Sequence, residues 1–360
     1  MTEHPVGDGR PRANIAGLGL IGGSIGLALV ERGWWVSGDD VDPRRVATAV
    51  ERGIVHAAGL DPDASITFVA TPVSSVVEVV RRALAETSGV VTDVGSVKSS
   101  VADVVEDPRF VGGHPMAGSE LEGLDGADGA MFQGAVWVLC PNDRTADRTF
   151  SAVAAIVAEL GADVVALPPE RHDEVVAVIS HVPHLTAATL MGLASERAEE
   201  HAALLRLAAG GFRDMTRIAS GHPAIWLDIC EENRPAIVTA LDGLIGGLAQ
   251  MRDVVAAGDR VALRDRLQRA REARANLPTK VSQPSELAEI RIPIPDRPGS
   301  AAQIFTLAAE LGVNIGSFEV VHSAEGDRGV AVVLVDASTA DLYRGGLLAR
   351  GYRPSVQRLS

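Results

Sequence analysis

Short apolar segments alternate with helical patterns over the first 165 residues of the chain. Runs rich in Val and Ile occur at residues 14–18, 34–38, 66–70, 90–94, 110–112 and 136–139. Strands that alternate with helices form a parallel sheet covered on both faces, and right-handed crossovers make such a sheet doubly wound. We therefore expect a doubly wound α/β domain over residues 13–168, after a flexible segment at 1–12. Ligands bind such a sheet at the carboxyl ends of its strands.

The pattern becomes purely helical after residue 168. Residues 170–201, 202–209, 224–257 and 259–277 are rich in Ala and Leu and have helical periodicity. This predicts an all-α domain over residues 169–278. Its apolar stripes are wide enough to be buried against a second subunit as well as within one chain, so we expect a homodimer.

A third, smaller unit follows a linker at residues 279–286, where Pro, Ser and Gln replace apolar periodicity. Strand patterns cover 287–294, 315–323 and 329–335, helical patterns cover 300–311 and 340–350, and a short last strand fits 355–359. This order predicts a small α+β domain of the ferredoxin-like type over residues 287–360.

Composition excludes several classes of partner. The formal net charge of −14 and the lack of a sustained basic block argue against nucleic acid. Cys140 and Cys230 give neither a disulfide framework nor a metal-ligand spacing, so no metal is expected. The polar opening and the glycines in the first apolar stretch fit neither a signal peptide nor a membrane span. We expect a cytoplasmic protein.

A glycine-rich motif, Gly17-Leu-Gly-Leu-Ile-Gly22, ends the first predicted strand and opens a helix. Such a turn lets backbone N–H groups approach a pyrophosphate, as in a Rossmann domain. Asp40 lies 23 residues past Gly17, where a carboxylate accepts hydrogen bonds from the adenosine ribose. Together with Asp39 and Asp42 it would repel a 2′-phosphate, which favours NAD over NADP.

Two alternatives remain for this segment: a tight turn in which Asp42 caps the next helix before Pro43, and a site for FAD. Ala70-Thr-Pro72 and Asp93-Val-Gly-Ser-Val-Lys98 follow the third and fourth predicted strands and belong to the same ligand edge. The predicted cofactor-binding residues are Gly17, Gly19, Leu20, Ile21, Gly22, Asp40, Thr71, Pro72, Asp93 and Gly95.

The predicted catalytic residue is His114, because it follows the fifth strand where a nicotinamide ring should lie. A histidine at a strand end is often structural, but the expected proximity of Ser96 and of a nicotinamide site favours a catalytic role. Ser119 and Glu120 follow in the same segment and bring polar groups to the same edge.

The helical domain contains two further polar motifs. In Ser180-His-Val-Pro-His184 two histidines lie three residues apart on one helix face, as in half of a metal site, but no third ligand is evident. We expect a substrate contact, with a core histidine as the alternative. Arg213, Asp214 and Arg217 fall within one helical turn, where Asp214 can fix Arg217 for a carboxylate. A solvated charge cluster is the alternative there, and Trp226 is a core anchor or a wall of the same pocket.

Together these motifs resemble those of the prephenate and arogenate dehydrogenases of tyrosine biosynthesis, over nearly the whole chain. The matching segments are Gly17-Leu-Gly-Leu-Ile-Gly-Gly-Ser24, Asp93-Val-Gly-Ser-Val-Lys98, His114-Pro-Met-Ala-Gly118, Ser180-His-Val-Pro-His184, and Thr216-Arg-Ile218 with Trp226 and Asn233. The resemblance implies an NAD-dependent oxidative decarboxylation that yields an aromatic ring.

By this resemblance His114 accepts a hydrogen bond from the 4-hydroxyl of the substrate, and Ser96 positions His114 or shares that hydroxyl. Arg217 binds a substrate carboxylate, although the sequence does not decide which of the two. The resemblance also implies substrate contacts from His184, Glu120, Ser119 and Trp226, and support from His181 and Asp214.

The substrate stays open between prephenate and arogenate. Arogenate carries an ammonium group that an acidic residue would favour, whereas His222 stands where some relatives carry an acid. This departure favours prephenate, with arogenate as the alternative.

The last unit resembles an ACT domain, a module that often binds amino acids. The resemblance rests on Asp296-Arg-Pro-Gly299 at a strand-to-helix turn and on Gly312-Val-Asn-Ile315 before the second strand. It implies feedback regulation by tyrosine, with a purely dimerising role as the alternative. The regulatory residues would be Asp296, Arg297, Pro298, Gly299, Asn314 and Ile315.

Two other classes of protein compete with this interpretation. A non-catalytic sensor of NAD and amino acids fits the domain order, although no DNA-binding unit is attached. A β-hydroxyacid dehydrogenase shares a Rossmann and a helical domain but should carry a catalytic Lys on the first long helix, and residues 170–195 contain none.

Overall fold

The structure is a computed structural model that describes residues 9–119, 121, 123–200, 208–221, 223–276, 287–295, 297, 299–322 and 328–358. Contacts along the chain divide it into two compact units, Met1–Leu248 and Ala249–Ser360. The predicted linker at 279–286 and most of the segment at 1–12 lie outside the described residues.

The first unit contains an eight-stranded sheet. Its strands are β1 (Arg12–Ala16), β2 (Trp35–Asp39), β3 (Ala57–Ala58), β4 (Ile66–Val69), β5 (Val90–Asp93), β6 (Phe110–Pro115), β7 (Val136–Cys140) and β8 (Asp163–Ala166). They pair in the order β3-β2-β1-β4-β5-β6-β7-β8. The chain winds outward from β1 in both directions, so the expected doubly wound α/β fold is confirmed.

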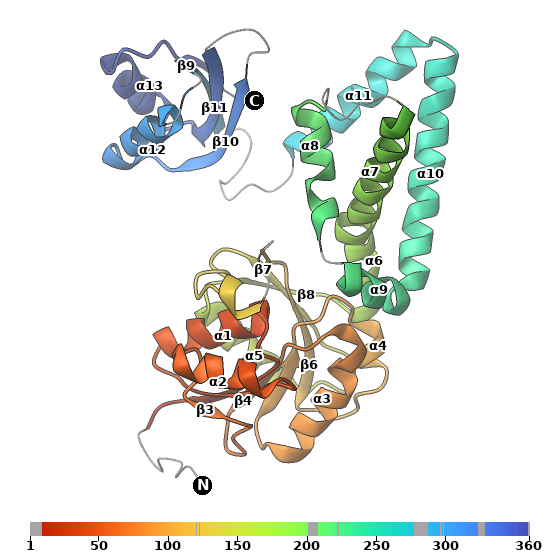
Figure 1. The fold of residues 1–360 in the computed structure, drawn as a ribbon, viewed down its shortest axis with the longest axis vertical. Coiled ribbons are helices and arrows are strands. Elements are labelled where there is room, and N and C mark those ends of the chain that lie inside the picture. The colour runs from red at the N-terminus through yellow and green to blue at the C-terminus, as the bar shows by residue number, and fades with distance from the viewer. Residues whose placement is uncertain are drawn as a thin grey trace. The chain divides into compact units, whose positions relative to one another are not determined.

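Helices cover both faces of this sheet. They are α1 (Leu20–Glu31), α2 (Pro43–Glu51), α3 (Val73–Glu86), α4 (Ser99–Ala102) and α5 (Asp147–Glu159). Ile25 of α1 and Val157 of α5 pack with Phe68 in one core, and Val76 and Val80 of α3 pack in another. In Figure 1, α1 and α3 lie on opposite sides of the strands. The nearly complete burial of β1 and β4 follows from this cover on two faces.

Part of the sheet is not parallel, so that expectation was wrong. β7 pairs with β6 in the antiparallel direction, and β8 runs parallel to β7. Between β6 and β7 the described residues contain the 3₁₀ turn η1 (Gly123–Gly126), which lies against α1, and no crossover helix. Parallel neighbours in a sheet need a long crossover connection, usually a helix, whereas antiparallel neighbours do not. The absence of a crossover helix among the described residues of this connection therefore fits the antiparallel pairing of β6 and β7. The short β3 and the more exposed β8 were not predicted.

The helical segment begins with a continuous helix whose backbone hydrogen bonds change from α to π and back to α along its length. It consists of α6 (Pro169–Val176), the π-helical turn η2 (Ala177–His181) and α7 (Val182–Glu200). The sequence pattern predicts one regular helix here, and the structure differs from this prediction at η2. A π-turn inserts an extra residue into the helix, rotates the residues that follow it, and is frequent at functional sites.

Further helices complete the first unit. They are α8 (Gly210–Thr216), the 3₁₀ turn η4 (Arg217–Ser220), α9 (Pro223–Glu232) and α10 (Arg234–Ala256), the last of which continues into the second unit. The predicted helix at 224–257 is therefore two helices that meet at Asn233. Of the predicted helix at 202–209, residues 208 and 209 are not helical and the rest lie outside the described residues.

The run Pro169–Glu196 is long and apolar enough, by length and composition alone, to cross a membrane. It also carries buried polar residues, among them His172, Asp173 and His181. Core helices of globular proteins pass the same test of length and composition, and buried polar residues that contact the sheet domain fit a core helix.

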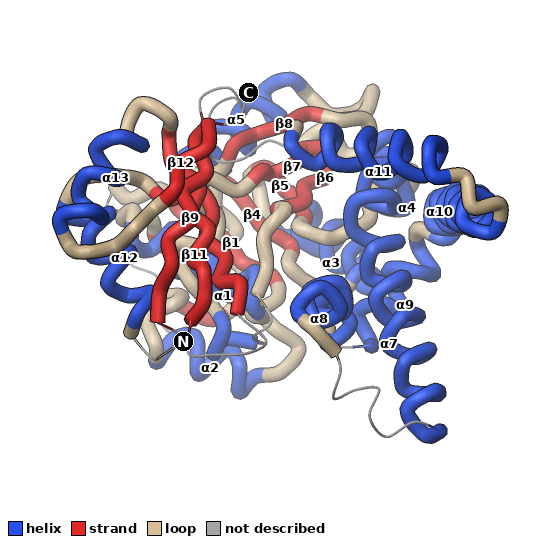
Figure 2. Tube along the Cα trace, turned by 90° about the horizontal axis from the view of Figure 1, so that it is seen from above, coloured by secondary structure: helices blue, strands red, loops and turns tan. Residues whose placement is uncertain are grey.

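The second unit holds α11 (Arg260–Ala275) and a four-stranded antiparallel sheet. Its other elements are β9 (Leu287–Pro295), α12 (Ser300–Glu310), β10 (Ile315–His322), β11 (Arg328–Asp336), α13 (Ala340–Ala349) and β12 (Ser355–Arg358), with strand order β10-β11-β9-β12. Ile304 of α12 and Tyr343 of α13 pack with Ile290 and Ile292 of β9. Both helices lie on one face of the sheet (Figure 2). The expected small α+β domain is confirmed.

Candidate active site

The glycine-rich turn between β1 and α1 is built by close packing. A Cβ atom on Gly17, whose φ is +102°, would lie 2.4 Å from the carbonyl oxygen of Ala70. A Cβ atom on Gly22 would lie 1.9 Å from the carbonyl oxygen of Gly17. At Gly19, the N-cap of α1, a Cβ would meet no atom within 4 Å, and no side chain caps the helix. This open helix N-terminus fits the pyrophosphate of a dinucleotide.

Asp40 joins this turn to the end of β2. Its two carboxylate oxygens accept hydrogen bonds from the amides of Leu18, at 2.8 Å, and Asp42, at 2.9 Å. An ionised carboxylate has about four acceptor sites, so it can still accept from a ribose hydroxyl. Asp42 caps α2 by accepting a hydrogen bond from the amide of Arg44 at 3.0 Å. This is the helix cap that the sequence offered as the alternative for Asp42.

An acidic groove of about 640 Å³ lies beside the turn. Asp39, Asp40 and Glu51 line it, together with apolar residues of α2 such as Val46 and Val50. Asp39 also forms an ion pair with Arg82. The apolar residues of this acidic groove fit an adenosine, and its carboxylates disfavour an additional 2′-phosphate.

Thr71 and Pro72 lie on the same edge of the sheet. The methyl group of Thr71 lies 3.1 Å from the position of a Cβ on Gly17, and Pro72 is the N-cap of α3. The buried hydroxyl of Thr71 has no hydrogen-bond partner among the described residues. Such a group is available to a ligand.

A buried ion pair fixes the loop after β5. Lys98 is 1% exposed and Asp93 is fully buried, and the two side chains contact each other. The Lys98 ammonium also donates to the carbonyl oxygen of Gly113 at 2.8 Å, and Asp93 accepts from the amides of Gly95 and Gly113. The carboxylate of Asp93 therefore supports the site from inside the protein. It holds the start of the His114 segment.

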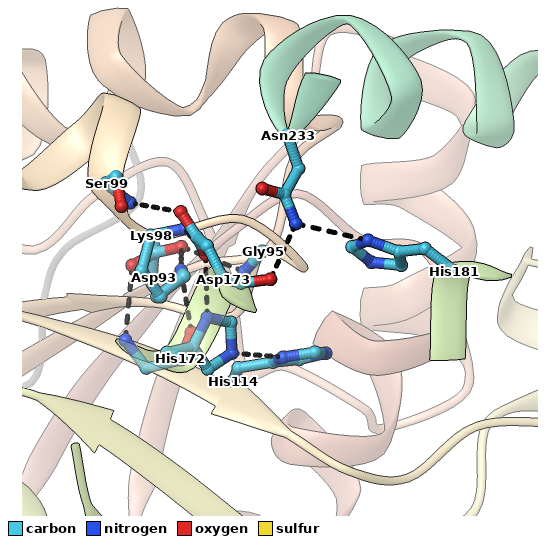
Figure 3. A network of polar contacts seen from close by, with 10 residues as sticks. Asp93, Gly95, Lys98, Ser99, His114, His172, Asp173, His181 and Asn233 are labelled. Atoms are coloured by element: carbon cyan, nitrogen blue, oxygen red, sulfur yellow. Dashed lines mark hydrogen bonds and ion pairs between the residues drawn. The ribbon is translucent and has the colours of Figure 1, made fainter. Parts of the chain in front are cut away.

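A chain of polar side chains extends from His114 (Figure 3). Nδ1 of His114 lies 2.8 Å from Nε2 of His172, and Nδ1 of His172 lies 2.8 Å from Oδ1 of Asp173. The Asp173 carboxylate also accepts from the amides of Lys98, at 2.9 Å, and Ser99, at 2.8 Å. These hydrogen-bonded side chains thus connect β6 to α6 and to the loop after β5. Sequence reasoning missed His172 and Asp173.

The surroundings of His114 favour its neutral form. Burial lowers its pKa well below the ordinary 6.5, and His172, Lys98 and His181 lower it further, while Asp173 opposes them. A neutral imidazole at this position can accept a proton. The hydroxyl of Ser96 makes no hydrogen bond to a described residue. The hydrogen-bond contact to Nδ1 of His114 therefore comes from His172 and not from Ser96.

Asn233, at the break between α9 and α10, joins the helical segment to this network. Its amide donates to the carbonyl oxygen of Asp173 at 2.9 Å and lies 3.2 Å from Nδ1 of His181. His181 is 1% exposed, and burial lowers its pKa to about 4. This contact connects His181 to the polar network around Asp173.

His184 stacks on Trp226, with ring centroids 3.5 Å apart and ring planes inclined by 13°. Burial lowers the pKa of His184, so the stacked ring is neutral at pH 7. The two rings form one aromatic surface from α7 and α9. No group of three or more His, Cys, Asp or Glu side chains that could hold a metal ion occurs among the described residues.

The remaining predicted residues lie in less regular segments. Arg217 and Asp214 are exposed at the junction of α8 and η4, so they do not share one regular α-helical turn. The hydroxyl of Ser119 accepts from the amide of Leu121 at 3.1 Å. Glu120 and His222 lie outside the described residues.

These features define a class of protein. An open helix N-terminus after β1, an acidic adenosine groove and a buried imidazole at the end of β6 are the arrangement of a dehydrogenase that uses a dinucleotide. Family models agree with this. Residues 25–195 match the model described as "Prephenate dehydrogenase, nucleotide-binding domain", and residues 168–269 match "Prephenate dehydrogenase, dimerization domain".

Individual relatives give the same result. A prephenate dehydrogenase of Bacillus subtilis is 32% identical over 334 residues, which cover 88% of this chain and 90% of that protein. The prephenate dehydrogenase of Aquifex aeolicus, solved with hydroxyphenyl propionate and NAD⁺, is similar with a TM-score of 0.70 and 28% identity, over 74% of this chain and 98% of that one. The arogenate dehydrogenase of Synechocystis has a TM-score of 0.64 and 30% identity, over 73% and 98%. The chain belongs to the prephenate dehydrogenase family and is an NAD-dependent oxidoreductase of tyrosine biosynthesis.

Proposed function

We propose that this chain converts prephenate and NAD⁺ to 4-hydroxyphenylpyruvate, CO₂ and NADH. NAD⁺ supplies the acceptor for a hydride from the ring carbon that bears the 4-hydroxyl. His114 takes the hydroxyl proton on Nε2 as the hydride leaves. The bond from the ring to its carboxylate then breaks, its electron pair makes the ring aromatic, CO₂ leaves, and the ring oxygen takes the proton back from His114. The observation that carries this proposal is the buried His114, whose Nδ1 is held by His172 while Nε2 has no partner among the described residues.

The site residues divide into catalytic, cofactor-binding, substrate-binding and supporting groups. His114 is the base, and Ser96 shares the substrate hydroxyl. The cofactor contacts come from Gly17, Gly19, Leu20, Ile21, Gly22, Asp40, Thr71, Pro72, Asp93 and Gly95. Arg217 binds one substrate carboxylate, since a guanidinium pairs with a carboxylate through two parallel hydrogen bonds. His184 and Trp226 form the aromatic wall, and Ser119, Glu120, His181 and Asp214 complete or support the pocket.

The choice of substrate and cofactor is tested by initial rates of NADH formation. We expect faster turnover with prephenate than with arogenate, because His222 stands where some relatives carry the acid that would pair with an ammonium group. We expect NAD⁺ to be preferred over NADP⁺ by about tenfold or more, since Asp39 and Asp40 line the adenosine groove. A higher rate with arogenate would instead assign the alternative activity, that of an arogenate dehydrogenase.

Assembly and regulation are part of the same proposal. The match to a family dimerization domain supports a homodimer, and a monomer in sedimentation would contradict it. The α+β fold of residues 287–358 supports an ACT domain that binds tyrosine, near Arg297, Gly299, Asn314 and Ile315. Tyrosine should then lower the rate of the full chain, and Asn314→Ala should weaken this inhibition. An unchanged rate in saturating tyrosine would leave the domain a dimerising role.

The proposed domain boundaries are 13–168, 169–278 and 287–360, and a cytoplasmic location is proposed with them. The location is supported by the use of NAD and by the family's biosynthetic role.

A further inference from the structure

The hydrogen bonds around Asp173 determine which of its neighbours carry protons. Burial raises the pKa of this carboxyl group, but hydrogen bonds from His172 and Ser99 outweigh burial and lower it overall. The group is therefore ionised at neutral pH and can only accept hydrogen bonds. Nδ1 of His172, which lies 2.8 Å away, must then carry a hydrogen.

The same reasoning extends along the chain to His114. When His172 is neutral, the hydrogen on its Nδ1 leaves a lone pair on Nε2, and this nitrogen lies 2.8 Å from Nδ1 of His114. Two lone pairs cannot face each other at this distance, so Nδ1 of His114 must donate. A neutral His114 then has its lone pair on Nε2.

We propose that His172 is a positioning residue, which holds His114 in the tautomer with the hydrogen on Nδ1 and the lone pair on Nε2. The tautomer follows from these contacts with a neutral His172, and its catalytic use rests on the function proposed above. When the substrate hydroxyl transfers its proton to Nε2, the resulting imidazolium keeps its Nδ1 hydrogen bond to His172. Asp173 stabilises the new positive charge through His172 without taking a proton.

The charged and titratable groups around His114 are consistent with this role. Lys98, from the loop after β5, is paired with Asp93, and His181 contributes from η2. Both lower the pKa of His114 and keep it neutral before the reaction. Asp173 is the nearby acid that favours the charged form after proton transfer. Removing a residue that hydrogen-bonds the other ring nitrogen of a functional histidine changes activity by about 10- to 100-fold, as known for histidines that bind metals.

The kinetic test compares two substitutions at this residue. His172→Ala removes the acceptor for Nδ1 of His114, so we expect kcat to fall about 100-fold while the KM values for prephenate and NAD⁺ change less than about twofold. His172→Gln places an amide oxygen within reach of Nδ1, so about tenfold of the lost rate should return. His56→Gln is a matched control, because His56 is a half-buried histidine that stacks on Trp35 and accepts from the amide of Val36. Its kcat should not change.

A spectroscopic test does not depend on turnover. In protein with ¹⁵N-labelled histidine, the His114 signals of the wild type should report a hydrogen on Nδ1, and those of His172→Ala a mixture of both tautomers. A hydrogen on Nε2 in the wild type would overturn the proposal, as would an unchanged kcat in His172→Ala. Absence of turnover in the wild type would instead contradict the proposed function, while the spectrum would still decide the tautomer.

Discussion

Replacing His114 with Asn should lower kcat for prephenate oxidation by about 1,000-fold, because general-base catalysis contributes about 100- to 10,000-fold. The amide can still accept a hydrogen bond from the 4-hydroxyl but cannot take its proton. Binding of NAD⁺, measured by fluorescence titration, should change less than about twofold, since His114 contributes no group to the proposed pyrophosphate contact. A kcat within about threefold of the wild type would exclude His114 as the base.

The pH dependence of the wild type gives a second readout of the same residue. The pKa of His114 is lowered well below 6.5, so its basic form is present throughout the neutral range and is lost only as pH falls through this depressed pKa. The acidic limb of kcat/KM, which reports the free enzyme, should therefore lie below pH 6.5. The residual activity of His114→Asn should lack this limb.

Replacing Lys98 with Met should lower the free energy of unfolding of the first unit by about 3–5 kcal/mol, because it leaves the buried carboxylate of Asp93 without a partner. Denaturation with urea, followed by tryptophan fluorescence, measures this effect. All four tryptophans lie in the first unit, Met1–Leu248, so the signal reports on that unit.

Two variants serve as controls for this effect. Arg144→Met breaks a surface pair with Glu106, in which the side chains are 47% and 75% exposed, and should cost less than about 1 kcal/mol. Combining Lys98→Met with Asp93→Asn removes the buried charge as well and should recover part of the loss. Equal small losses for Lys98→Met and Arg144→Met would contradict the stabilising role of the buried pair.

Local patterns in the sequence predicted much of the fold and part of the site. The alternation of apolar runs predicted six strands of the first sheet, and all four strands and both helices of the small α+β domain were placed within one or two residues. The glycine-rich motif and His114 stood out because each follows an apolar run directly. Such signals depend only on neighbouring residues.

The features that the sequence did not predict depend on distant contacts. His172 lies 58 residues from His114, and its proximity to His114 follows from the course of β7, α5 and β8, which no local pattern contains. The Pro168-Pro169 step and the adjacent His172-Asp173 pair were the available signals for this helix start. The reversal at β7 was missed because burial, and hence hydropathy, is similar for parallel and antiparallel central strands. The π-turn at η2 was missed because it inserts a residue without interrupting the apolar pattern.

The most direct measurement of the central claim uses prephenate with an isotopic label in its ring carboxylate. Purified protein is mixed with this substrate and NAD⁺, and NADH and labelled CO₂ are measured in the same reaction. The proposed reaction predicts that both form in equal amounts and that both are lost in His114→Asn. NADH without labelled CO₂ would contradict oxidative decarboxylation, and binding of NAD⁺ without either product would instead indicate a non-catalytic sensor.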